Sequence, residues 1–343
     1  MNRRRFIASL ASIGLVAVGA PVRGQPVSKR LADMHTHLGF RSEVSPREAM
    51  ARGGMFLIAE KITPDGPLLQ RIAGRLTASR AARPGEIRRN FERALARRMK
   101  RLQTDGLGIV DSAQALAASV ESGEPAVVIA AEGADFLEGE IGYLDKVRAQ
   151  GLVHLQLVHY YMPSLVGDVS TEPAVHQGLT AFGRELVAAC NRLGILVDVA
   201  HCTSAGIEHA LDASTKPVIY SHGQVSQNAP HSSQNVIHAR AIHAPLARRI
   251  ADKGGVIGVW PLWSQFAHLD LYADEIVAMV KQFGAQHVGV GTDMYGLPRS
   301  VVPTYEEFAK LADLLPRRGL NAAEVDAVLG GNYVRVLREA ITV

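Results

Sequence analysis

Several short apolar segments of this 343-residue chain end on a histidine or an acidic residue. The residues at these ends are His35 with His37 close behind it, Glu132, His159, His201, His222 and Asp293. Imidazole nitrogens suit zinc, and a carboxylate can bridge two metal ions. The set offers enough ligands for two Zn²⁺ ions, with other divalent metals as alternatives. Taken singly, such a histidine is more often a hydrogen-bonded structural residue, and such an acid a helix N-cap.

The chemistry that this set predicts is metal-assisted hydrolysis. His35 and His37 alternate along one strand, so both imidazoles face the same side and can hold one metal ion. Two ions about 3.5–4 Å apart clamp a bridging hydroxide and polarise a carbonyl group. Asp293, the last of the set, is then placed to take a proton from that water and return it to a leaving amine.

These residues follow apolar, β-branched runs that alternate with helical patterns. The runs predict strands at residues 30–35, 55–61, 126–132, 152–159, 195–201, 217–222, 256–261 and 287–293. Helices are predicted over residues 178–193, 204–211, 245–253, 275–283, 305–315 and 322–341. Such strands indicate a parallel sheet with both faces covered. We expect an α/β fold, a (β/α)8 TIM barrel with helical insertions, in preference to an open doubly wound sheet. Its C-terminal strand ends would point into one site.

Residues 1–24 have the layout of a signal peptide. The arginines Arg3–Arg5 precede an apolar run, and the arginine pair before Phe6-Ile7 resembles a twin-arginine signal. Residues 25–343 are then expected to form a single metal-dependent hydrolase domain, periplasmic or secreted. An uncleaved N-terminal anchor is the alternative. After residue 24, no apolar stretch is long enough to span a bilayer.

The net charge bears on which partners the protein can bind, and the two cysteines bear on whether it contains a disulfide. Without the signal, which holds four arginines and no acid, the formal net charge falls from +4 to zero. Nucleic-acid binding thereby loses its main support. The basic stretch from Arg71 to Arg101 reads as an amphipathic helix with a solvated charged face, and an acidic partner or membrane surface is the alternative. Cys190 and Cys202 allow either a disulfide or two buried free thiols.

Six motifs in a fixed order give the chain a resemblance to the membrane dipeptidases (renal dipeptidases, peptidase family M19) of the amidohydrolase superfamily. They are His35-Thr36-His37, Ala131-Glu132-Gly133, Leu157-Val158-His159, Val197-Asp198-Val199-Ala200-His201, Ile219-Tyr220-Ser221-His222 and Gly291-Thr292-Asp293. Residues 178–183 with 191–194 are similar to the family's helix before the fifth strand. Residues 323–325 with Gly331-Asn332 are similar to its closing helix. The motifs are specific as a set, although His-x-His alone is weak.

The resemblance implies a role for each of the metal-ligand types. His35 and His37 would hold the first zinc ion. His201 and His222 would hold the second, and Glu132 would bridge the two ions.

The resemblance also implies the catalytic groups and the substrate. His159 would polarise the substrate carbonyl and stabilise the oxyanion, and Asp293 would be the proton shuttle. Substrates of the family are dipeptides, often with a D-residue at the C-terminal position, and some members cleave β-lactams.

The sequence departs from the family pattern where substrate identity is set. A basic residue that binds the substrate carboxylate in the family is missing from the stretch Ser232–Val236, and Arg240 is a candidate substitute. Tyr295 stands where the family generally has an aspartate, so we count it as a substrate contact. His231 and His238 are further candidate contacts, with mobile surface histidines as the alternative.

We therefore expect an exported dipeptidase-like enzyme whose partner is a small-molecule substrate, a dipeptide or a similar amide. A homodimer is left open. The rivals are a related two-metal hydrolase or tailoring enzyme acting on another small molecule, a non-catalytic metal-binding barrel, and an adaptor that uses the basic helix.

The first motif also differs from the family, which usually has aspartate at the position of His37. The site then carries one negative charge fewer, and the attacking water should be more acidic. The variant His37→Asp should move the acidic limb of the pH–rate profile to higher pH. Measuring kcat/KM across pH for both proteins checks this, and an unmoved limb would contradict it.

Overall fold

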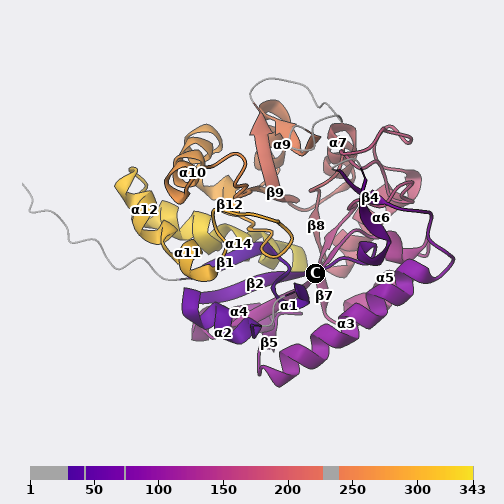
Figure 1. The fold of residues 1–343 in the computed structure, drawn as a ribbon, viewed down its shortest axis with the longest axis horizontal. Coiled ribbons are helices and arrows are strands. Elements are labelled where there is room, and N and C mark those ends of the chain that lie inside the picture. Colours follow the sequence, from indigo (N-terminus) through magenta and orange to yellow (C-terminus); the bar gives the residue numbers. More distant parts are fainter. Residues whose placement is uncertain (1–29, 42–43, 73–74, 227–238, 343) are drawn as a thin grey trace, which may run out of the picture.

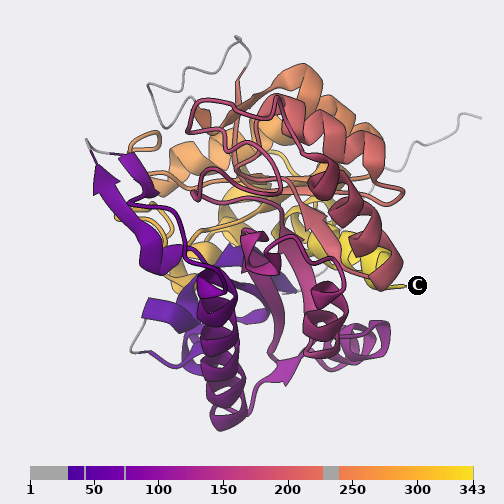
Figure 2. The ribbon, with the colours of Figure 1, turned by 90° about the vertical axis from the view of Figure 1, so that its right-hand side faces the viewer.

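The computed structural model describes residues 30–41, 44–72, 75–226 and 239–342. Eight parallel strands stand side by side in the order of the chain and curve into a barrel (Figure 1, Figure 2). They are β1 (Leu31–Thr36), β2 (Met55–Ile62), β6 (Ala126–Glu132), β7 (Leu152–Gln156), β8 (Leu196–Asp198), β9 (Ile219–Ser226), β11 (Val256–Val259) and β12 (Val288–Val290). Each of the eight predicted runs contains at least half of one of these strands.

Contacts between the first and last strands close the ring. The Asp293 N–H, just beyond β12, donates to the His35 carbonyl at 2.8 Å, and the His37 N–H donates to the Met294 carbonyl at 2.9 Å. The barrel expected from the sequence is therefore confirmed, and the open doubly wound sheet is excluded. Short strands β5 (Gly108–Ile109) and β10 (Ala241–His243) extend the sheet beside β6 and β9.

Helices surround the strands (Figure 1). They are α2 (Pro46–Gly53), α3 (Glu86–Thr104), α4 (Ala113–Ser122), α5 (Tyr143–Ala149), α6 (Ala181–Leu193), α7 (Ser204–Ala213), α9 (Ala244–Asp252), α10 (Leu269–Phe283), α11 (Tyr305–Ala309), α12 (Leu311–Arg317), α13 (Ala322–Asp326) and α14 (Asn332–Ile341). The helix predicted from residue 178 begins at Ala181, because the Thr180 hydroxyl accepts the Gly183 N–H and caps it. The helix predicted over 322–341 is interrupted by the wide turn η4 (Ala327–Gly331).

Helix α14 closes the N-terminal end of the barrel. It contacts β1, β8, β11 and β12, which lie on different sides of the ring. Its side chains join one apolar cluster with the first residues of several strands, among them Leu196, Ile219 and Val256. The turn before it passes so close to β1 that a Cβ on Gly330 would lie 2.1 Å from the Arg30 carbonyl oxygen. Among the described residues, α14 covers this end of the barrel, and the strand ends that carry the histidines and acids lie at the opposite end.

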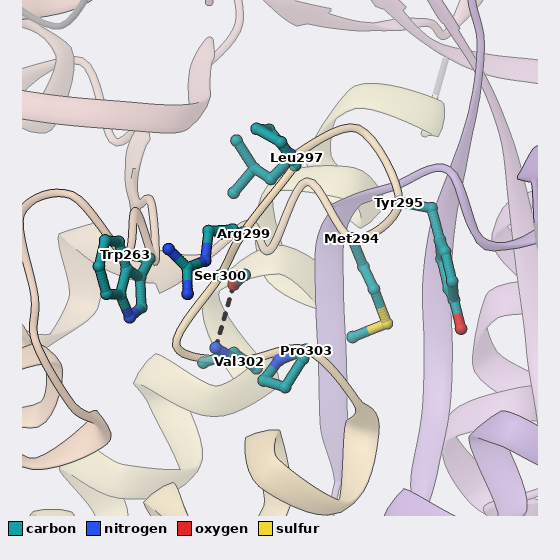
Figure 3. Close-up of a pocket in the computed structure, with 9 residues that line it drawn as sticks. Trp263, Met294, Tyr295, Leu297, Arg299, Ser300, Val302 and Pro303 are labelled. Atoms are coloured by element: carbon teal, nitrogen blue, oxygen red, sulfur yellow. Dashed lines mark hydrogen bonds between the residues drawn. The ribbon is translucent and has the colours of Figure 1, made fainter.

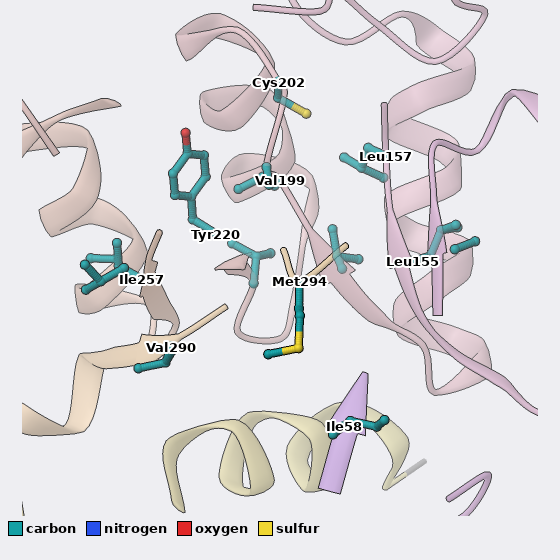
Figure 4. Packing of buried hydrophobic residues seen from close by; sticks show 14 of the residues in the cluster. Ile58, Leu155, Leu157, Val199, Cys202, Tyr220, Ile257, Val290 and Met294 are labelled. Atoms are coloured by element: carbon teal, nitrogen blue, oxygen red, sulfur yellow. The ribbon is translucent and has the colours of Figure 1, made fainter. Parts of the chain in front are cut away.

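A second apolar cluster fills the space between the strands and the outer helices. Figure 4 shows buried side chains of this cluster on several different strands, including Ile58, Leu155, Tyr220, Ile257 and Val290. Cys190 and Cys202 belong to it as buried free thiols, and burial raises the pKa of both. No helix within the described residues is long and apolar enough to cross a membrane.

The basic stretch differs from its prediction in two respects. Residues Leu69–Ile72 and Arg75–Ala78 form an antiparallel hairpin, β3–β4, so the helix begins only at Glu86. One arginine of the helix is also turned inward. The Nε atom of Arg98 lies 2.6 Å from an oxygen of Glu60, and both side chains are buried.

Removing this arginine should destabilise the fold strongly, because the Glu60 carboxylate would remain buried without its partner. We expect Arg98→Ala to lower the free energy of unfolding by about 3–5 kcal/mol. The neighbouring Arg97 is exposed on the same helix, so Arg97→Ala should cost less than about 1 kcal/mol. Urea unfolding followed by circular dichroism measures the free energy of unfolding of both variants. An equal loss of stability in the two variants would contradict the assignment of a buried ion pair.

Candidate functional site

The buried carboxylate of Glu132, the last residue of β6, is the centre of the site. Histidines from other strand ends surround it with their Nε2 atoms. The distances are 3.2 Å for His201, 3.5 Å for His35 and 3.8 Å for His222 to Oε1, and 3.2 Å for His37 and 3.5 Å for His159 to Oε2. Each of these histidines was expected at the site from sequence alone. Oε2 has no hydrogen-bond partner among the described residues.

Asp293 supplies a second carboxylate on the far side of His37. Its Oδ1 lies 3.2 Å from His37 Nε2 and 3.8 Å from His35 Nε2. The backbone of Asp293 is left-handed, with φ of 50°, and Gly296 makes room for it, since a Cβ there would lie 2.0 Å from Oδ1. His201 is also left-handed, with φ of 67°. Each such conformation costs on the order of 1 kcal/mol or more, so backbone strain is concentrated at this site.

The acidic and basic side chains of the site shift one another's pKa values. Burial raises the pKa of Glu132, but the surrounding histidines, His159 and His35 foremost, outweigh it and hold that pKa well below its usual range. Burial lowers the pKa of His37, but the neighbouring carboxylates of Asp293 and Glu132 outweigh it and raise that pKa to about 9. Burial, reinforced by nearby positive charge, lowers the pKa of His201 and His222. The lowered pKa values of His201 and His222 and of Glu132 favour the neutral imidazoles and ionised carboxylate that bind a divalent metal ion, whereas His37 would lose a proton on binding one.

Three overlapping groups of donors could each hold a metal ion. All donor atoms within a group lie within 4.8 Å of one another, and the groups are His35–His37–Asp293, His35–Glu132–His222 and Glu132–His159–His201. The first and second groups share His35, and the second and third share Glu132, so ions held by the second and third groups would both contact the Glu132 carboxylate.

Residues that the sequence analysis missed hold the histidine rings in place. The Ser221 hydroxyl lies 3.2 Å from His35 Nδ1 and 2.9 Å from His222 Nδ1, which turns both Nε2 atoms toward Glu132. The Ser221 N–H donates to the carboxylate of Asp198, which forms a buried ion pair of 2.8 Å with Lys61. Ser221 and Asp198 lie inside the motifs recognised from sequence, but neither has a signal of its own.

Arg240 is buried in the site instead of facing solvent. Its Nη2 lies 2.8 Å from His222 Nε2, and its guanidinium lies 4.7 Å from the centre of the Trp260 ring. Its Nε has no hydrogen-bond partner among the described residues. His231, His238 and the stretch 232–236 lie outside the described residues, as does the signal segment.

A cavity of about 470 Å³ opens above Glu132, His37, His159, His201 and Asp293. Its walls are mainly apolar and come from the turn after β2, the β3–β4 hairpin, Trp260 and the loop after β12. The wall residues include Pro67, Leu69, Leu76, Leu262, Tyr295, Leu297 and Pro298, with Arg71 as a cation on the hairpin. A polar floor under apolar walls is the usual form of a small-molecule site.

A second cavity of about 380 Å³ lies on the other side of the loop after β12. Figure 3 shows the Arg299 side chain beside Trp263 there, with its guanidinium 4.0 Å from the ring centre, whereas Tyr295 points away from both. Tyr295 lines both cavities, so it also borders the space above the metal-ligand groups.

Asp135, three residues beyond Glu132, has a buried carboxyl group that accepts the Leu165 N–H at 2.9 Å. Among the described residues, no hydrogen bond or ion pair joins it to the histidines of the site. Burial raises its pKa from 3.8 to about 7. Between about pH 4 and pH 7 the folded state therefore keeps a proton that the unfolded chain has released, and stability falls as pH rises.

The variant Asp135→Asn keeps the acceptor for Leu165 but cannot ionise. Its free energy of unfolding should therefore fall less between pH 4.5 and pH 8 than that of the parent, by up to about 4 kcal/mol. Unfolding of both metal-free proteins by urea at the two pH values provides the comparison. If the free energy of unfolding changes equally with pH in both proteins, the pH dependence of stability does not come from Asp135.

Curated relatives and solved structures resemble the chain over most of its length. It is 27% identical over 271 residues to a dipeptidase of Claviceps purpurea, tcpJ, covering 76% of this chain and 62% of that protein. An uncharacterised dipeptidase of Schizosaccharomyces pombe is 27% identical over 260 residues, 71% of this chain and 60% of that protein. The aligned region thus spans less than two thirds of these relatives.

Two solved structures share the fold. An amidohydrolase from Pseudomonas aeruginosa matches with a TM-score of 0.72 and 24% identity, covering 91% of this chain and 96% of the other. A metallopeptidase from Rhodobacter sphaeroides, solved with a phosphinate mimic of the dipeptide L-Ala-D-Ala, matches with a TM-score of 0.75 and 17% identity, covering 91% and 99%. The sequence model of the membrane dipeptidases, peptidase family M19, matches residues 80–343, and the chain therefore belongs to that family.

Proposed function

We propose that this protein is a two-metal hydrolase that cleaves the amide bond of dipeptides. The observation that carries the proposal is the Glu132 carboxylate, surrounded by five histidine Nε2 atoms at 3.2–3.8 Å on the floor of a cavity. The dipeptidase names of the relatives agree with it.

The donor set fits two Zn²⁺ ions bridged by Glu132. Oε2 of Glu132 is buried without a hydrogen-bond partner among the described residues, and burial lowers the pKa of His201 and His222, which favours the neutral imidazoles that bind zinc. We propose His35 and His37 for one ion and His201 and His222 for the other. When bound, such ions supply Lewis acidity and an activated water.

The other polar residues of the site would act on the substrate directly. Asp293 lies at the cavity floor, where it can take a proton from the attacking water and deliver it to the leaving amine. His159 faces the same space and is proposed to stabilise the oxyanion of the tetrahedral intermediate. Buried Arg240, whose Nε has no partner, is proposed to bind the substrate carboxylate.

The cavity walls suggest which dipeptides fit. The apolar hairpin and the loop after β12 favour substrates with apolar side chains, and Tyr295 borders the space that they would occupy. An alternative function, hydrolysis of a different small amide, is favoured by Tyr295 itself, because the family pattern has an acid at that position.

We also propose that the protein acts outside the cytoplasm. The support is the run Arg3–Arg5 before Phe6-Ile7 and the apolar segment that follows. A twin-arginine route would allow metal loading and folding before export.

The proposal predicts metal-dependent turnover of dipeptides. Zinc-loaded protein should release amine from members of a panel of L,L and L,D dipeptides, and removal of the metal by a chelator should abolish release. Asp293→Asn should lower kcat by roughly 10²–10⁴-fold, because the proton shuttle is lost.

Metal content, measured by plasma mass spectrometry, should be two zinc ions per chain in the parent. A parent protein with two ions and no turnover of any dipeptide would exclude the dipeptidase function and favour another substrate or a non-catalytic metal-binding barrel.

A further inference from the structure

The histidines around Glu132 differ in what holds their second ring nitrogen. His35 and His222 share the Ser221 hydroxyl, and His201 Nδ1 has no hydrogen-bond partner among the described residues. His159 is held by a carboxylate. Its Nδ1 lies 2.8 Å and 3.0 Å from the two oxygens of Asp65.

Asp65 is well placed to fix both the ring and the backbone of this segment. Its Oδ2 also accepts the Tyr160 N–H at 3.2 Å, so one buried carboxylate holds two consecutive residues beyond β7. Both of these residues line the cavity. With Nδ1 bound to Asp65, the opposite nitrogen of His159 points toward Glu132 and the substrate space.

The segment that carries Asp65 is itself anchored. It follows β2 in the turn Thr63-Pro64-Asp65-Gly66, where the Gly66 N–H donates to the Thr63 carbonyl and the Leu68 N–H to the Asp65 carbonyl. The Asn90 side chain of α3 donates to the Pro64 carbonyl at 3.2 Å. The turn therefore has a fixed position relative to the barrel and can transmit that position to His159.

We propose that Asp65 is the positioning residue for His159 and sets the place of its Nε2 relative to the substrate carbonyl oxygen. This inference rests on the proposed hydrolase function. Such partners of an active-site histidine typically change activity by about 10–100-fold when removed. Because His159 would interact most strongly with the tetrahedral intermediate, the loss should appear in kcat more than in KM.

The test compares Asp65→Ala, Asp65→Asn and the parent, all zinc-loaded, on the dipeptide that the parent turns over best. We expect Asp65→Ala to lower kcat by about 10–100-fold with KM changed less than about threefold. Asp65→Asn keeps an oxygen acceptor for Nδ1–H, so it should recover part of the lost kcat. Arg97→Ala, on the exposed face of α3, is the control, and it should leave both constants near those of the parent.

A binding measurement separates positioning from a general loss of structure. Affinity for a phosphinate mimic of L-Ala-D-Ala, measured by calorimetry, should fall in Asp65→Ala by about the same factor as kcat/KM, because the tetrahedral phosphinate imitates the intermediate. Zinc content should remain at two ions per chain. If Asp65→Ala does not fold, the partial loss in Asp65→Asn is the deciding comparison.

The possible outcomes separate this inference from the function on which it rests. A parent that turns over no dipeptide ends the proposed function, and the inference with it. An active parent with unchanged kcat in Asp65→Ala and Asp65→Asn overturns the inference alone. The inference is also overturned if the lower kcat of Asp65→Ala is fully explained by a lower zinc content. The same holds if Asp65→Ala raises KM but leaves the affinity for the phosphinate unchanged.

Discussion

The buried carboxylate of Glu132 is the constraint on which the rest of the site depends. A charge without solvent is costly unless opposite charge or hydrogen-bond donors compensate it, and here the compensation comes from histidines on other strands. Those rings must in turn be oriented, which Ser221 does for two of them. Asp198 and Lys61 then fix Ser221 from inside the barrel. A chain of polar contacts thus runs from the metal-ligand groups to the sealed end of the barrel, where Tyr333 of α14 contacts His154 beside the same ion pair.

Much of the fold and of the site floor could be predicted from sequence, for a specific physical reason. Barrel strands are buried on both faces, so they appear as continuous apolar runs, and a histidine or acid that ends such a run stands out. Contacts between residues that are far apart in the sequence could not be predicted in this way. Helical periodicity predicts that α3 has an inner face, but it cannot show that Arg98 turns inward to Glu60. Asp65 was missed because Thr-Pro-Asp-Gly is an ordinary turn sequence, and its contact with His159 spans 94 positions.

The floor and the walls of the cavity have different origins. The floor comes from strand ends, whose positions are set by the hydrogen bonds of the sheet. The walls come from the β3–β4 hairpin and the loops after β11 and β12, which the barrel does not constrain to one length or shape. The chemistry of the site therefore depends on the fold, whereas the choice of substrate depends on these segments. The hairpin, formed by Leu69–Ile72 and Arg75–Ala78, lies outside the region that the family model matches, residues 80–343.

The hydrogen bonds that close the barrel join His35 to Asp293 and His37 to Met294. The seam of the barrel therefore runs through the active site, between the first and last polar residues of the set. A nascent chain that has not yet emerged beyond residue 290 contains the other site residues, but the free edge of β1 still lacks its partner. Closure of the barrel and arrival of the Asp293 carboxylate at the site therefore depend on the same segment. A chain whose barrel has closed at this seam has therefore also brought its first and last polar site residues together.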